Sequence, residues 1–101
     1  MTKLIYFGKS TRWNKRFRAK FEEPDKRTVT VHFSTIGGKT YIDGVDPDVR
    51  DRYLKRHAVD LKTGDPLRAG FLAYYVTWGK SRNIEDNLKS YLKRFNIKDA
   101  R

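Results

Sequence analysis

Cysteine is absent from this 101-residue chain, and so is any long hydrophobic run. Without cysteine the chain forms neither disulfides nor thiolate metal sites. The longest apolar stretch, Phe71 to Val76, is much shorter than the ~20 residues that span a bilayer. Met1 to Lys9 contains no apolar core of secretory length. We therefore expect a soluble, intracellular protein with no transmembrane segment.

Negative charge is scarce as well. The chain has 23 lysine and arginine residues against 12 aspartate and glutamate residues, which gives a net charge of +11. An excess of this size is self-repelling in a folded domain and favours a polyanionic partner. Nucleic acid, an anionic membrane surface and an acidic protein are the partners to consider, and a role in solubility alone is the remaining explanation. We rank nucleic acid first.

Histidine is also scarce, since the chain has only His32 and His57. With no cysteine and no close histidine pair, a zinc site lacks its ligands. The acidic residues lie at turns and helix starts, where capping accounts for them. Three Gly-Lys-Ser/Thr triplets begin at Gly8, Gly38 and Gly79, but none has the earlier glycine that a phosphate-binding loop requires. We predict that the protein is not an enzyme and has no catalytic residue, metal site or cofactor. A deep pocket around His57 together with a perturbed carboxylate would reopen that question.

Alternating residues in the first third of the chain predict strands. Arg16 to Glu22 and Thr28 to Phe33 both alternate polar with apolar residues, and Lys3 to Gly8 is a short apolar run. Glu23 to Lys26 has the composition of a turn, because Pro24 presets φ and an aspartate follows it. The aromatic content of 14% indicates a folded chain rather than a disordered one.

The two alternating segments also predict their own register. If Phe21 lies opposite Val29, every apolar residue of the pair falls on one face, as an antiparallel pair with one buried side requires. A shift by one residue would mix the two sets. The other face then carries only polar side chains, namely Arg16, Arg18, Lys20, Thr28, Thr30 and His32.

Three helical segments follow the strands. Asp46 and Pro47 form an N-cap and first-turn pair. Asp65-Pro66 repeats this pair before an apolar segment, which we expect to form the most buried helix and to end near Gly79. Asn83 is expected to cap a third helix, whose apolar residues follow the helical period.

The order of these elements predicts the fold class. Strands followed by helices indicate an α+β fold, with a three-stranded antiparallel sheet followed by three helices packed on one face. No linker is long enough to divide the chain. We expect a single domain over residues 1–101, with a sheet part at 1–40 and a helical part at 46–98.

Residues 9–20 are the most informative segment for function, because they combine basic side chains with Trp13 and contain no acid. Basic side chains contact phosphates, and Trp13 can either stack on a base or fold into the core. Alternate strand residues lie about 7 Å apart, a spacing comparable with that of successive phosphates. We predict a nucleic-acid-binding surface made of Lys9, Arg12, Trp13, Lys15, Arg16, Arg18, Lys20, Thr30 and Lys39.

Several segments in sequence order resemble a known family. They are Lys15 to Phe17, Val29 to Phe33, Asp51 to His57, Asp65 to Gly70, Trp78 to Lys80 and Tyr91 to Phe95. In these segments the chain resembles a family of small, basic, uncharacterised proteins encoded by large DNA viruses of eukaryotes, the giant-virus and algal-virus group. The resemblance implies a viral protein located in the host nucleus or cytoplasm, or packaged in the virion. It implies no activity.

The predicted function is nucleic-acid binding, with DNA favoured over RNA, mainly through phosphate contacts. If about six phosphates are neutralised, log affinity falls with log salt concentration at a slope near −5. The alternative is a virion structural or adaptor protein that binds an acidic protein partner. Binding that depended on an apolar patch and survived high salt would favour that alternative. The sequence leaves the oligomeric state open.

Overall fold

The computed structural model describes residues 1–101, which form strands first and helices after them. The three long strands are β1 (Lys3–Lys9), β2 (Lys15–Glu22) and β3 (Thr28–Thr35). The helical part consists of η1 (Tyr41–Asp43), α1 (Pro47–His57), η2 (Ala58–Thr63), α2 (Ala69–Leu72), η3 (Ala73–Thr77) and α3 (Ile84–Arg94). A short strand, β4 (Lys98–Asp99), ends the series. The predicted α+β class is confirmed.

The sheet has four strands in the order β3-β2-β1-β4. Strand β2 is antiparallel to both of its neighbours, whereas β4 runs parallel to β1 and pairs with it at Lys3 and Leu4. The prediction of three antiparallel strands is therefore wrong in strand number and in direction. The buried side chain of Ile97 anchors the chain after α3, so that Lys98 donates its backbone N–H to the Thr2 carbonyl at 3.0 Å.

The predicted register between β2 and β3 is confirmed. Phe21 lies opposite Val29, Ala19 opposite Val31, and Phe17 opposite Phe33. Burial follows the alternation, since Ala19, Phe21 and Phe33 are almost completely buried. A β-bulge between Leu4 and Tyr6 shifts the alternation in β1, so that Leu4 and Phe7 both lie beside the apolar residues of β2.

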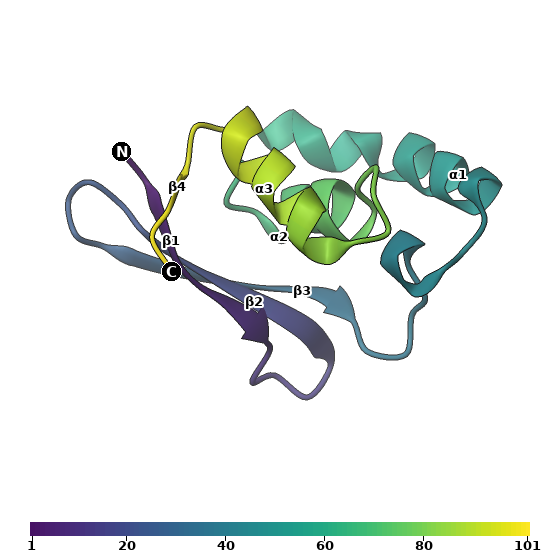
Figure 1. The fold of residues 1–101 in the computed structure, drawn as a ribbon, viewed down its shortest axis with the longest axis horizontal. Coiled ribbons are helices and arrows are strands. Elements are labelled where there is room, and N and C mark those ends of the chain that lie inside the picture. Colours follow the sequence, from purple (N-terminus) through teal and green to yellow (C-terminus); the bar gives the residue numbers. More distant parts are fainter.

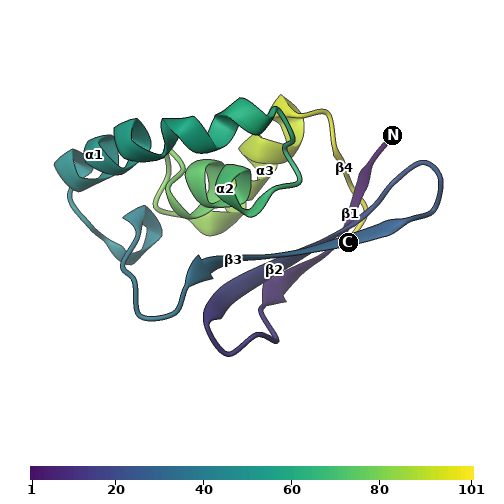
Figure 2. The same cartoon turned by 180° about the vertical axis from the view of Figure 1, so that it is seen from behind.

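The helices cover one face of the sheet and leave the other face uncovered (Figures 1 and 2). The core lies between these two layers and joins the sheet residues to the apolar sides of η3 and α3. Its side chains are Leu4, Ala19, Phe21, Val31, Phe33, Leu72, Val76, Leu88, Tyr91, Leu92 and Ile97.

The residues predicted to begin the helices agree with the structure for two of the three helical segments. Helix α1 begins at Pro47 after Asp46, as predicted. Helix α3 begins after Asn83, whose side chain accepts a hydrogen bond from the Asp86 backbone N–H at 3.2 Å. The second segment begins only at Ala69 and changes into the π-helical turn η3. No helix in the structure has the length and apolar character needed to cross a membrane.

Candidate nucleic-acid interface

The uncovered face of the sheet brings together polar and aromatic side chains from three strands. Arg18 lies between Gly8 of β1 and His32 of β3, and Lys20 lies between Tyr6 and Thr30. We call this set the outer face and define it by its side chains, namely Tyr6, Arg18, Lys20, Thr30 and His32. Two of the predicted basic residues and the predicted Thr30 therefore lie side by side on it.

Arg18 is the central residue of the outer face. Its guanidinium carbon lies 4.6 Å from the centre of the Tyr6 ring. Its Nε is buried and has no hydrogen-bond partner, and its guanidinium forms no ion pair. The buried Nε is out of reach of a ligand, so only the terminal nitrogens of this unpaired guanidinium could contact an external oxyanion.

Gly8 allows the Tyr6 ring to lie in this position. A Cβ atom at Gly8 would be only 2.6 Å from the Tyr6 hydroxyl oxygen. The absence of a side chain lets the ring extend over β1 toward Arg18, the cross-strand neighbour of Gly8. Cation–π contact of this kind fixes the guanidinium plane while leaving its edge available for hydrogen bonds.

His32 lies at the edge of this cluster beside Ser10. The Ser10 hydroxyl oxygen is 2.7 Å from His32 Nδ1 and accepts a hydrogen bond from the Arg12 backbone N–H at 3.0 Å. Desolvation lowers the pKa of His32, and the charges of Arg12 and Arg18 lower it further. Burial is the larger cause of the lowered pKa of His32, and the two arginines add a smaller contribution that favours its neutral form.

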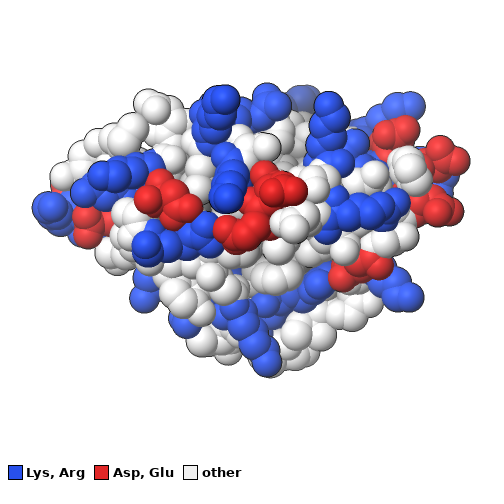
Figure 3. Space-filling model, in the orientation of Figure 1, with Lys and Arg blue, Asp and Glu red and all other residues white.

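The loop between β1 and β2 extends the basic surface beyond the sheet. Trp13 is 88% exposed. Of the two alternatives for this residue, folding into the core is therefore excluded. Arg12 and Lys9 are also exposed. In the view of Figure 3, the lower edge of the molecule, where this loop lies, shows Lys and Arg atoms among uncharged ones and no Asp or Glu atoms.

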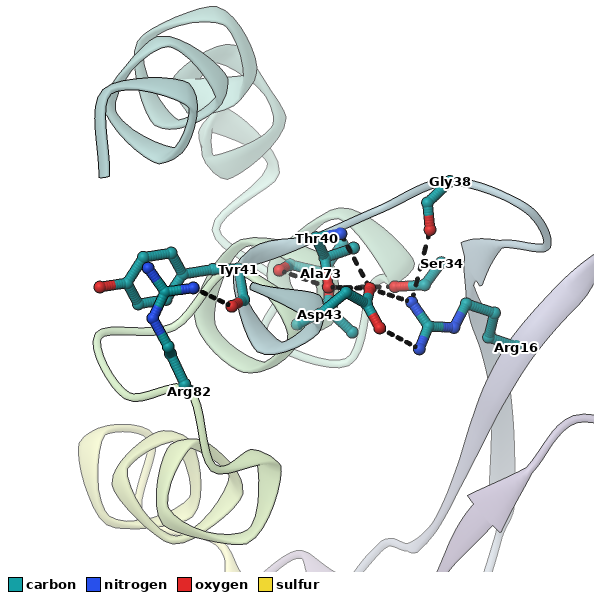
Figure 4. Close-up of polar contacts among 9 residues, drawn as sticks. Arg16, Ser34, Gly38, Thr40, Tyr41, Asp43, Ala73 and Arg82 are labelled. Carbon is teal, nitrogen blue, oxygen red and sulfur yellow. Dashed lines mark hydrogen bonds and ion pairs between the residues drawn. The ribbon is translucent and has the colours of Figure 1, made fainter. Parts of the chain in front are cut away.

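Arg16 differs from the other predicted basic residues because it is already paired. Its two terminal nitrogens donate to the two carboxylate oxygens of Asp43 at 2.6 and 3.0 Å (Figure 4). These bonds, aided by a backbone N–H and hydroxyl from Thr40, lower the pKa of Asp43 to about 2 against an opposing effect of burial. Arg16, which the alternation predicted to point outward with Arg18 and Lys20, is thus already held in an ion pair.

Lys15 and Lys39 lie elsewhere, at a cleft of about 390 Å³ between the end of the sheet and the helices. His57 and Asp60 line the same cleft, with His57 Nδ1 3.0 Å from an Asp60 carboxylate oxygen. Tyr53 is stacked between His57 and Trp78, and its burial raises its pKa to about 12. A pocket around His57 thus exists, although no group of three metal-ligating side chains accompanies it.

Sequence reasoning missed Tyr6 as a member of the outer face and did not pair His32 with Ser10. Lys3 to Gly8 is an apolar run without alternation, so it gives no sign of the bulge after Leu4 that sets Tyr6 on the outer face. Ser10 belongs to one of the Gly-Lys-Ser triplets, and its hydrogen bonds make it a local anchor for the loop rather than a phosphate ligand.

One comparison with known proteins gives a match. Residues 5–57 match the model of a family described as a family of unknown function (DUF5754). The match covers just over half of the 101-residue chain and includes the outer face, the β1–β2 loop and α1. No curated protein and no solved structure matches the chain.

Proposed function

The chain belongs to the DUF5754 family, which has no assigned function, and we propose from its own residues that it binds nucleic acid through the outer face and the β1–β2 loop. The observation that carries this proposal is the unpaired guanidinium of Arg18 on a sheet face that no helix covers. Phosphate oxygens are suitable acceptors for the terminal nitrogens of Arg18, whereas its buried Nε takes no part in the contact.

Phosphate contacts explain why the basic residues are placed at these positions. Arg18 and Lys20 are two residues apart on one strand, about 7 Å along it, so they can contact successive phosphates. Arg12 and Lys9 add positive charge at the end of the same face. With Arg16 neutralised and Lys15 and Lys39 at the cleft, about four phosphate contacts remain, which corresponds to a salt slope near −3.6.

Double-stranded DNA is the ligand we propose. Because the outer face spans three strands of a four-stranded sheet, it is wider than the two-stranded ribbon that enters the major groove, and it would contact the phosphate backbone instead. Trp13 at the tip of the neighbouring loop is exposed enough to stack on an unpaired base or to wedge against a sugar. Readout of sequence is expected to be modest, because phosphates dominate the contacts.

The alternative function, an adaptor that binds an acidic protein partner, is favoured by one observation. Trp13 and Ile36 are large exposed apolar residues on adjacent loops, which are joined by a hydrogen bond from the Ile36 backbone N–H to the Asn14 carbonyl at 3.1 Å. An aromatic residue in such a patch is a typical hot spot for a protein partner. Binding that survives high salt would favour this alternative.

The test is a fluorescence-anisotropy titration of double-stranded DNA at several salt concentrations. The double variant Arg18→Gln/Lys20→Gln is compared with Lys89→Gln/Lys93→Gln, which removes the same charge from the exposed side of α3. We expect the outer-face variant to bind DNA more weakly. The slope of log affinity against log salt concentration should become shallower by about 2. Equal losses in the two variants would mean that net charge alone attracts DNA, and the proposal would fail.

A further inference from the structure

A second basic site lies within the helical layer, away from the outer face. It is a pocket of about 240 Å³ between α1, η3, the turn at Gly79 and α3. Its polar lining includes the cationic side chains of Arg50, Lys80 and Arg94, together with Tyr74, Tyr75 and Ser90. No residue of the outer face contributes to it, so its role is independent of the nucleic-acid interface.

The charges in this pocket are uncompensated. None of Arg50, Lys80 and Arg94 forms an ion pair, and no aspartate or glutamate lines the pocket. The three cations line one small volume and repel one another, and solvent weakens this repulsion at Lys80 and Arg94, which are exposed. An anion in the pocket would relieve this repulsion.

Two of the three cations are held in place by the protein. The Nε of Arg50 donates to the carbonyl oxygens of Trp78 and Gly79, both at 3.1 Å, which leaves its terminal nitrogens available. The guanidinium carbon of Arg94 lies 5.0 Å from the centre of the Tyr75 ring. Donors fixed in this way lose little conformational freedom when they bind a ligand.

The backbone around the pocket is also fixed. The buried Asn87 side chain donates to the carbonyl oxygens of Val76 and Ser81 and accepts from the Ser81 backbone N–H. This clamp holds the turn that contains Lys80. A Cβ at Gly79 would be 2.3 Å from the side chain of Asn87, so only glycine permits the close approach.

We propose that this pocket binds a phosphate monoester. Its volume is below the roughly 300 Å³ at which pockets begin to hold drug-sized ligands, so it suits a phosphate group with part of a sugar. A monoester carries nearly two negative charges at pH 7, which matches a cluster of three cations better than the single charge of a diester. The monoester belongs either to a free nucleotide or to the 5′ end of a nucleic-acid strand.

The first test measures binding of AMP and adenosine by calorimetry at constant ionic strength. We expect AMP to bind and adenosine not to bind. Lys80→Gln and Arg94→Gln should each weaken AMP binding about tenfold, as expected for the loss of a hydrogen bond to a charged group. Lys93→Gln is the matched control, because Lys93 is exposed beside Arg94 and does not line the pocket.

The second test identifies the source of the phosphate. A 5′-phosphorylated oligonucleotide is compared with its 5′-hydroxyl form, in the wild-type protein and in Arg94→Gln. A preference for the phosphorylated form that Arg94→Gln abolishes would assign the pocket to a strand end. Binding of AMP without such a preference would assign it to a free nucleotide.

The proposal has two outcomes that would overturn it. One is that neither AMP nor the 5′-phosphate is bound at millimolar concentration. The other is that Lys93→Gln weakens AMP binding as much as Arg94→Gln does. The variant Arg18→Gln/Lys20→Gln is expected to bind AMP normally, so a failure of the outer-face proposal leaves this one standing, and the reverse holds as well.

Discussion

Arg16 and Asp43 form a two-point ion pair that fastens the start of β2 to the turn before α1. Asp43 also accepts hydrogen bonds from the backbone and hydroxyl of Thr40, so one carboxylate organises the chain between the sheet and the helices (Figure 4). This arrangement has consequences for stability and for binding, and each can be tested.

The first prediction concerns acid stability. The pKa of Asp43 is lowered from 3.8 to about 2, so the stabilisation from its charged form is fully present above about pH 4. It is lost as the pH falls from about 4 to about 2, because the unfolded chain takes up the proton first. Asp43→Asn should lower the free energy of unfolding at pH 7 by about 1 kcal/mol and reduce its loss over that range. Urea unfolding at several pH values measures both effects, and an unchanged pH dependence would contradict the prediction.

The second prediction concerns DNA affinity. Asp43→Asn releases Arg16, which gives the binding surface one more free cation. We expect the salt slope of DNA binding to steepen by about 0.9, the value for one additional phosphate contact. Asp48→Asn changes the net charge equally, and Asp48 is exposed and unpaired, so it is the control. Equal effects of the two substitutions would show that Arg16 stays away from the nucleic acid.

The third prediction concerns Gly79. In Gly79→Ala the new Cβ would meet the Tyr75 carbonyl at 2.4 Å and the Asn87 side chain at 2.3 Å, and neither can move without breaking the clamp. We expect a loss of about 3 kcal/mol in the free energy of unfolding, at the upper end for overpacking. In Gly38→Ala the nearest atom is 3.5 Å away, so the change should be within about 0.5 kcal/mol. Denaturant titrations of the two variants make the comparison.

The fourth prediction uses the two tryptophans. Trp13 is 88% exposed and Trp78 is 7% exposed, so a soluble quencher should reduce the emission of Trp13 selectively. DNA should alter the emission of wild-type protein and leave that of Trp13→Phe almost unchanged. Trp13→Ala should weaken binding about tenfold through the loss of stacking, whereas Trp13→Phe should retain part of it. If the emission of Trp13 does not change when DNA is added, the β1–β2 loop does not belong to the interface.

The pairing of β2 with β3 could be predicted, because the alternation of polar and apolar residues assigns each side chain to one face of the sheet. Phe17 and Phe21 alternate with basic residues, and only one register with Val29 buries all the apolar side chains. Strand β4 could not be predicted, because it has two exposed residues and is held in place by pairing with β1. An alternation of polar and apolar residues can be recognised only in longer segments than this one.

The two Asp-Pro pairs show how one local signal leads to two results. Asp46-Pro47 begins a helix, whereas Asp65 accepts a hydrogen bond from the Leu67 backbone N–H and closes a turn. The turn at Asp65 is also held by a contact distant in sequence, since Tyr91 donates its hydroxyl to the Pro66 carbonyl. The dipeptide alone does not contain this information.

The candidate site was predictable in part for a similar reason. Arg18 and Lys20 follow from the strand alternation, and their exposure on one face is a local property. The partner of Arg16 is 27 residues away in the sequence, and charge composition does not reveal such a pairing. The pocket of Arg50, Lys80 and Arg94 combines three separate segments, so the order of residues gives no sign of it.

The pairing of β4 with β1 places the last residues of the chain beside its first strand, a few residues from Met1. Lys98 donates to the Thr2 carbonyl and Ala100 to the Leu4 carbonyl, so a short linker can join the last residue to the first. New ends can then be opened in the exposed turn at residues 24–27, between β2 and β3. A circularly permuted protein of this kind would keep the outer face, the β1–β2 loop and the pocket of the helical layer intact.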